Sequence, residues 1–113
     1  MKLKLCRLEE LADGDAKGFD LGPGAEPREL FLYREGRRVL AYENLCPHMA
    51  APLDMSARDL MAPDGRHFLC STHGALFRVD DGLCVAGPCY GQALAQLEVE
   101  VDPAGDVNLV GED

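Results

Sequence analysis

Cysteine and histidine occur together twice in this sequence, each time within a short turn-like segment. The first segment contains Cys46 and His48 in a Cys-x-His pattern, and the second contains Cys70 and His73 in a Cys-x-x-His pattern. Thiolate and imidazole groups favour zinc, copper or iron–sulfur centres over the hard cations that prefer oxygen. Two such segments side by side would supply four ligands at one point. The sequence therefore predicts a metal centre held by these four side chains.

The donor set leaves three interpretations open: a mononuclear zinc site, a binuclear iron–sulfur cluster, and a degenerate or metal-free site. Zinc sites with two Cys and two His usually keep like ligands together, as Cys-x2–4-Cys and His-x3–5-His. Here each segment holds one ligand of each kind, and Cys-x-His is tight spacing for two ligands of one ion. A binuclear cluster accommodates this if both cysteines bind one iron and both histidines the other. The pattern favours the cluster.

The residues around these ligands resemble the Rieske [2Fe-2S] family, and most closely its small stand-alone ferredoxins. The resemblance is carried by Cys-Pro-His at 46–48 with Ala-Pro-Leu at 51–53, by Cys-x-x-His-Gly-Ala-x-Phe at 70–77, and by the following Gly87 and Pro88. It extends over nearly the whole chain. In the family, a proline-containing loop covers the cluster, and the resemblance implies that the segment with Pro88 does so here.

The resemblance also implies a role for each ligand. One [2Fe-2S] cluster would be bound, with Cys46 and Cys70 on a buried inner iron. His48 and His73 would hold an outer iron near the surface, where electrons leave.

Short β-strands must position these ligands. Apolar and polar residues alternate at 2–8 and 97–102, with Leu97, Val99 and Val101 expected to face inward, and Gly, Pro, Asp and Asn separate the short apolar stretches. Strands at 30–34 and 37–42 flank Glu35-Gly36, which predicts a hairpin turn. Residues 9–19 have the composition of a turn-rich connector. We expect about eight short antiparallel strands and little helix.

The resemblance implies an all-β fold: a Rieske-type antiparallel β-sandwich or barrel base with a small cluster-binding subdomain of two loops. We expect a single Rieske domain over residues 1–113. The base would comprise approximately residues 1–44 and 89–113, and the cluster-binding subdomain approximately residues 45–88.

Departures from the family pattern indicate the type of carrier. High-potential relatives carry an extra cysteine in each loop, joined as a disulfide, where this chain has Ala51 and Thr72. They also use a serine and a tyrosine to hydrogen-bond the sulfurs, where this chain has Ala75 and Phe77. Fewer donors stabilise the extra electron less, so we expect a potential near the low end of the roughly −150 to +300 mV Rieske range.

The remaining histidine and cysteines indicate a carrier and not an enzyme. A complete oxygenase needs a further 2-His-1-carboxylate site, and His67 is the one histidine left over. Cys6 and Cys84 lie in strand-like sequence, where we expect buried, apolar behaviour. Cys89 follows the Gly-Pro pair, and whether it affects the cluster is open.

Charge and composition narrow the partners. The chain has 11 Lys and Arg against 20 Asp and Glu, a formal net charge of −9, which argues against nucleic acid and anionic membrane as partners. No apolar run is long enough for a signal peptide or a membrane span, and five cysteines fit reduced thiols or metal ligands, so we expect a cytoplasmic protein.

Three hypotheses of function follow. The first is a low-potential ferredoxin that takes one electron from a flavin reductase and passes it to a terminal oxygenase or similar enzyme. The second is a tightly bound small subunit of a reductase, similar to the small subunit of nitrite reductases. The third is a zinc-stabilised binding module without redox function.

Overall fold

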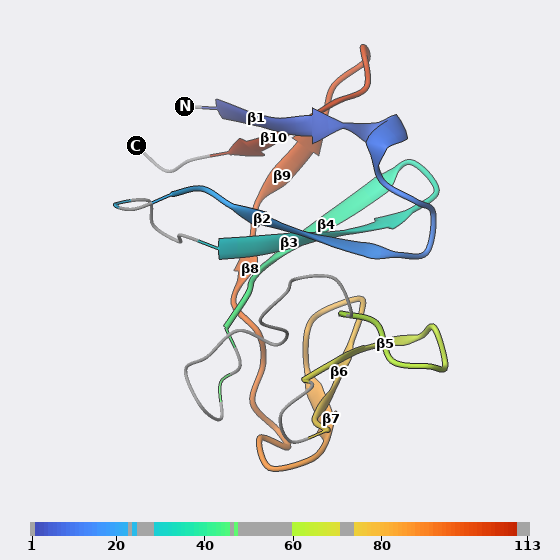
Figure 1. The fold of residues 1–113 in the computed structure, drawn as a ribbon, viewed down its shortest axis with the longest axis vertical. Coiled ribbons are helices and arrows are strands. Elements are labelled where there is room, and N and C mark those ends of the chain that lie inside the picture. Colours follow the sequence, from blue (N-terminus) through green and yellow to red (C-terminus); the bar gives the residue numbers. More distant parts are fainter. Residues whose placement is uncertain are drawn as a thin grey trace.

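Three antiparallel sheets make up the described part of the chain (Figure 1). The computed structural model describes residues 2–22, 24, 29–45, 47, 60–70 and 74–110. Within them the one helical element is a short 3-10 helix, Leu8–Glu10. The predicted all-β fold with little helix is confirmed. No helix among the described residues is long and apolar enough to cross a membrane.

The first sheet joins the two ends of the chain. Its strands, in the order β1-β10-β9, are β1 (Lys2–Arg7), β10 (Asp106–Val110) and β9 (Val99–Val101). The register of β1 against β10 shifts between Lys4 and Cys6, which marks a bulge. The sheet lies at the top of Figure 1, away from β5, β6 and β7.

The second sheet has four strands in the order β2-β3-β4-β8. They are β2 (Ala16–Asp20), β3 (Glu29–Glu35), β4 (Arg38–Glu43) and β8 (Gln96–Leu97). The predicted hairpin is present, but its two-residue turn is Gly36-Arg37, one position later than expected, because Glu35 still pairs with Arg38. Gly36 has a φ of 63°, a conformation that suits glycine.

Ten strands occur in the described residues where about eight were expected, for two reasons. The predicted connector at 9–19 was partly wrong, because its end forms β2 against β3. The predicted C-terminal strand divides at Glu98, since Leu97 pairs with β4 in the second sheet while Val99 pairs with β10 in the first. The expectation that Leu97, Val99 and Val101 face inward is confirmed, since all three pack on a buried core.

The third sheet is small and has the order β5-β6-β7. Its strands are β5 (His67–Leu69), β6 (Leu76–Arg78) and β7 (Cys84–Ala86). It occupies the lower part of Figure 1. The division of the chain into a base and a cluster-binding subdomain at residues 45 and 88 stays a prediction.

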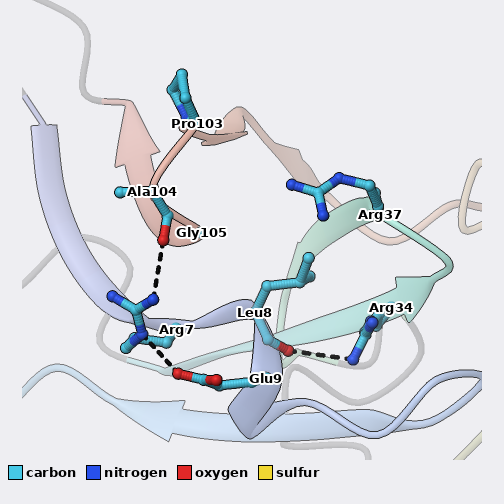
Figure 2. Close-up of a pocket in the computed structure, with 8 residues that line it drawn as sticks. All are labelled: Arg7, Leu8, Glu9, Arg34, Arg37, Pro103, Ala104 and Gly105. Carbon is cyan, nitrogen blue, oxygen red and sulfur yellow. Dashed lines mark hydrogen bonds and ion pairs between the residues drawn. The ribbon is translucent and has the colours of Figure 1, made fainter.

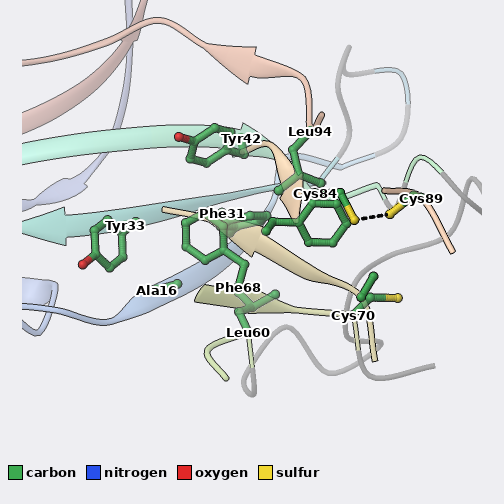
Figure 3. Close-up of a cluster of buried hydrophobic side chains, with 12 residues drawn as sticks. Ala16, Phe31, Tyr33, Tyr42, Leu60, Phe68, Cys70, Cys84, Cys89 and Leu94 are labelled. Atoms are coloured by element: carbon green, nitrogen blue, oxygen red, sulfur yellow. Dashed lines mark hydrogen bonds between the residues drawn. The ribbon is translucent and has the colours of Figure 1, made fainter. Parts of the chain in front are cut away.

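The second sheet is buried on both faces, and this arrangement joins the three sheets. Leu30 and Leu32 of β3 face one core, which also holds Cys6 and Val107 from the first sheet. Phe31 and Tyr33 face the opposite way, because side chains alternate along a strand. They meet residues of the third sheet in a second core, drawn in Figure 3.

The Phe68 ring packs against three other aromatic rings in this second core. The Phe68 ring of β5 lies 4.8 Å from Phe31, 5.4 Å from Tyr42 and 5.6 Å from Tyr33, between ring centroids, in edge-on arrangements. Such geometry contributes about 0.5–1.5 kcal/mol per pair beyond the burial of apolar area. Phe68 therefore fastens the small sheet to β3 and β4.

Candidate metal centre

Cys70 is the predicted ligand that the structure describes. It follows β5 directly and is 2% exposed. Its backbone N–H donates to the Ala75 carbonyl at 2.9 Å, and its carbonyl accepts from the Gly74 N–H at 2.8 Å. Gly74 has a φ of 72°, which an L side chain rarely adopts. These contacts join Cys70, at the end of β5, to the residues that precede β6.

The side chain of Cys70 fits a buried thiolate ligand. It lies at the edge of the aromatic core, and in Figure 3 its sulfur points away from the rings of Phe31 and Phe68. A thiol in this place can bind a soft metal while hydrogen bonds to Gly74 and Ala75 hold the backbone of Cys70. The donor chemistry of Cys70 thus agrees with a cluster ligand.

The segment that carries the first motif is tied to the same small sheet where it ends. The Leu69 N–H donates to the Leu60 carbonyl at 2.8 Å, and Met61 forms an isolated antiparallel bridge with Phe68. The Ala62 N–H donates to the His67 carbonyl at 2.8 Å. Leu60 therefore lies beside the residue that precedes Cys70.

The start of that segment is held by β4. The buried Tyr42 hydroxyl donates to the Val79 carbonyl at 2.9 Å, just after β6. Asn44 is 4% exposed, and its N–H donates to the Glu29 carbonyl at 3.0 Å. The chain between Asn44 and Leu60 is therefore attached to β3 at its start and to β5 at its end.

The Gly-Pro segment packs directly on the second motif. A Cβ atom at Gly87 would lie 2.7 Å from the Cα atom and 3.0 Å from the Cβ atom of Ala75, and the φ of Gly87 is 101°. Only a glycine permits this approach without displacement of the backbone. Ala75 is 1% exposed under this contact.

Three of the four predicted ligands, Cys46, His48 and His73, lie outside the described residues. No three His, Cys, Asp or Glu side chains gather into a metal-binding group within the ranges that are described. The ligand set beyond Cys70 therefore stays a prediction.

The structure also describes Cys6, Cys84 and His67, which lie outside the predicted ligand set. Cys6 and Cys84 are 4% and 1% exposed, so their predicted burial is confirmed. His67 is a half-buried strand residue whose Nδ1 atom lies 2.8 Å from Asp64 Oδ2. The Arg66 backbone N–H and this His67 contact lower the pKa of Asp64.

One arrangement in this region was not foreseen from the sequence. Cys89 is 2% exposed, and its sulfur lies 2.9 Å from the sulfur of Cys84 (Figure 3). The Cys-x4-Cys spacing was the available signal, but it has no fixed geometric meaning outside its fold.

A surface pocket of about 430 Å³ lies on the other two sheets and contains none of the predicted ligands (Figure 2). Two arginines in its wall are engaged by the protein itself. Arg7 binds Glu9 at 2.7 Å and Asp106 at 3.1 Å, and Arg34 donates to the Leu8 carbonyl at 3.3 Å. These arginines fasten the 3-10 helix to its neighbours. The lining residues are Arg7, Leu8, Glu9, Arg34, Arg37, Pro103, Ala104 and Gly105.

Comparison with known proteins gives one family. The model of the Rieske [2Fe-2S] domain matches residues 1–101. The cytochrome bc1 complex Rieske iron-sulfur subunits of Streptomyces lividans and Streptomyces coelicolor are each 30% identical over 87 residues, or 77% of this chain. The chain spans about half of the first relative (47%) and about a quarter of the second (23%).

Solved structures match over nearly the full length of the chain. A chain of the complex of reduced oxygenase and oxidized ferredoxin in carbazole 1,9a-dioxygenase is 32% identical, with a TM-score of 0.75 and coverage of 98% of this chain and 94% of that chain. The ferredoxin of carbazole 1,9a-dioxygenase from Nocardioides aromaticivorans is 27% identical, with a TM-score of 0.75 and 98% of both chains covered.

A putative NADH-dependent nitrite reductase small subunit from Mycobacterium tuberculosis shares the fold. It is 23% identical, with a TM-score of 0.69, and the match covers 96% of this chain and 93% of that chain.

Proposed function

We propose that this chain, which belongs to the Rieske [2Fe-2S] domain family, passes single electrons from a flavin reductase to a terminal oxygenase or similar enzyme. A Rieske domain holds a [2Fe-2S] cluster, so the chain is an electron-transfer component and not itself an enzyme. The observation that carries the proposal is the nearly full-length match to a chain of a complex between a ferredoxin and its oxygenase.

In this proposal Cys46 and Cys70 hold the inner iron, and His48 and His73 hold the outer iron. The burial of Cys70 at the end of β5 supports the inner position. The attachment of Leu60 beside Leu69 supports a first motif that lies close to the second. When bound, the cluster supplies a site that gains and loses one electron.

The protein around Cys70 sets the conditions for this exchange. Ala75 and Phe77 are 1% and 0% exposed, and their side chains have no hydrogen-bond donor to offer a cluster sulfur. We therefore propose that the cluster has a reduction potential near the low end of the Rieske range. Such a potential suits a protein that donates electrons to an oxygenase. Gly87 packs on Ala75 and so helps to exclude water from this side of the loop.

The negative net charge of the chain indicates the kind of partner surface that it would bind. A net charge of −9 would steer the chain toward a basic patch on a partner protein, and the association rate would then fall as salt is added.

A cytoplasmic location is part of the same proposal. Its support is that Cys6, Cys70, Cys84 and Cys89 are not disulfide-bonded, as is usual in a reducing compartment.

The alternative is a tightly bound small subunit of a reductase, for which the fold shared with the nitrite reductase small subunit is the support. An obligate interface needs a large apolar area. Among the described residues the exposed large hydrophobics are Leu3, Leu45 and Tyr90, of which Leu3 lies on β1 in the first sheet. The ferredoxin of carbazole 1,9a-dioxygenase matches at a higher identity than this small subunit, 27% against 23%, which favours the carrier.

An electron-transfer assay tests the proposal. The cluster-loaded chain is mixed with NADH and a flavin reductase without oxygen, and an oxidised Rieske oxygenase is then added. We expect the visible absorption of the chain to bleach and then to recover. The Cys70→Ala variant should do neither, while Cys6→Ala, a buried cysteine in the other core, should behave as the wild type. A loaded chain that neither bleaches nor recovers would contradict the carrier role.

A further inference from the structure

Two buried cysteines outside the predicted ligand set face each other in the third sheet. Cys84 begins β7, and Cys89 lies in the loop that follows this strand. Their side chains are 1% and 2% exposed, and the two sulfurs are 2.9 Å apart (Figure 3). The Cys84 sulfur also lies 3.2 Å from the Ala86 carbonyl oxygen.

The backbone imposes this approach. The Cys84 N–H donates to the Gln92 carbonyl at 2.7 Å, and the Gly91 N–H donates to the Cys84 carbonyl at 3.1 Å. The Gln92 N–H donates to the Cys89 carbonyl at 2.8 Å. The loop therefore folds back on Cys84 and presents Cys89 to it. Rotation of a thiol alone does not separate the two residues.

The two sulfurs are only slightly farther apart than the sulfurs of a disulfide bond. A disulfide has a sulfur–sulfur length of about 2.05 Å, so the two atoms need to approach by roughly 0.9 Å. The proposal requires that rotation of the two side chains closes this gap and brings the dihedral angle about the two sulfurs near 90°.

We propose that Cys84 and Cys89 form a reversible intramolecular disulfide when the protein meets a low-molecular-weight disulfide such as oxidised glutathione. One thiolate attacks the oxidant, and a mixed disulfide forms as one molecule of reduced glutathione leaves. The second cysteine then attacks the protein sulfur of this mixed disulfide and releases the second glutathione. The two thiols lose two protons and two electrons in total, and the oxidant becomes two thiols.

Burial decides how the first step begins. Since both thiols are covered, the loop must open before an oxidant reaches either of them. Pro88, Tyr90 and Gly91 around Cys89 are exposed, so this opening moves little buried surface. Oxidation is then limited by loop opening, and the second step, between neighbouring sulfurs, is fast.

The disulfide would fasten the loop that packs on the second motif. Gly87 lies between the two cysteines in sequence and is the residue in close contact with Ala75. A cross-link across this short loop restricts the unfolded chain. We expect it to raise the melting temperature by about 5–10 °C.

The sequence offers a direct chemical test. No Lys or Arg follows Arg78, so trypsin releases residues 79–113 as one peptide that contains both cysteines and no others. Cys6, Cys46 and Cys70 fall in separate peptides. The cluster-loaded protein is incubated with oxidised glutathione, denatured in an excess of iodoacetamide and digested with trypsin. The masses of the peptides are then measured by mass spectrometry. Iron is measured before and after the incubation.

We expect peptide 79–113 to carry no alkyl group and to be two hydrogen atoms lighter than the reduced, unalkylated peptide. The protein should keep its iron, and the Cys6 peptide should be alkylated. Dithiothreitol before alkylation should restore two alkylation sites. The Cys6→Ala variant should give the same result, and in Cys84→Ala the remaining cysteine should stop at a glutathione adduct. Two alkylated cysteines, a lasting glutathione adduct in the wild type, or a cross-link to the Cys70 peptide would each overturn the proposal.

Discussion

A methyl group added at Gly87 tests whether the loop after β7 is held tightly against the second motif. The Gly87→Ala side chain would lie 2.7 Å from the Ala75 Cα atom, and the φ of 101° disfavours any L residue. Gly91→Ala is the matched control, because Gly91 has a φ of 88° in the same loop but nothing within 4 Å of the added atom.

The two variants separate backbone strain from steric overlap. Strain at a positive φ costs about 1–3 kcal/mol and applies to both. Overlap with a buried backbone costs a further about 1–3 kcal/mol and applies to Gly87→Ala alone. At about 4 °C per kcal/mol for a chain of this size, Gly87→Ala should melt roughly 4–12 °C below Gly91→Ala.

The assay is thermal unfolding of the cluster-loaded proteins at one scan rate, followed by circular dichroism and by visible absorption. Because Ala75 belongs to the loop that starts at Cys70, Gly87→Ala should also lose its visible absorption at a lower temperature than Gly91→Ala. Equal melting temperatures for the two variants would show that the close contact with Ala75 does not exist in solution, and the reasoning would fail.

Three further predictions concern the core and the ligands. Burial, with Asp81 and Asp80 adding to it, raises the pKa of Tyr42 to about 12, against about 10 in the unfolded chain, so its stabilising contribution is complete below pH 10 and is lost between pH 10 and 12. At pH 7 the Tyr42→Phe variant should be less stable than the wild type by about 1 kcal/mol, because it lacks the hydrogen bond to Val79, and should melt at a lower temperature. Near pH 12 it should melt at a higher temperature than the wild type. Plots of melting temperature against pH that stay parallel for the two proteins would contradict this. Phe68→Ala should cost about 3–5 kcal/mol in urea unfolding, whereas Tyr90→Ala, at a residue that is 74% exposed, should stay within about 0.5 kcal/mol. Cys70→Ala should lose the visible spectrum and Cys84→Ala should keep it, and loss of the cluster in Cys84→Ala would mean that the ligand set is wrong.

The strands that alternate or pair locally were predictable from the sequence. The hairpin around Gly36 was placed within one residue, because a glycine turn between two apolar strands is a local signal. β2 was missed, because Ala16 is the one fully buried residue in it and its pairing with β3 depends on tertiary contacts. The division of the last strands at Glu98 was missed for a similar reason, since no local feature marks a change of sheet.

The candidate site was more predictable in kind than in arrangement. Residue types and spacing pointed to the four ligands, and the structure adds that Cys70 is buried and that Leu60 lies next to Leu69. The contact between Cys84 and Cys89 could not be foreseen, because the return of the loop onto β7 sets it. The importance of Gly87 was likewise hidden until Ala75 appeared beneath it.

The central claim is that this chain holds a [2Fe-2S] cluster through Cys46, His48, Cys70 and His73. Measurement of iron, acid-labile sulfide and zinc in protein purified without oxygen tests it most directly. The account predicts about two irons and two sulfides per chain, no zinc, and loss of both in each of the four single alanine variants. One zinc per chain without sulfide, or retention of the full iron and sulfide content in any of those variants, would contradict it.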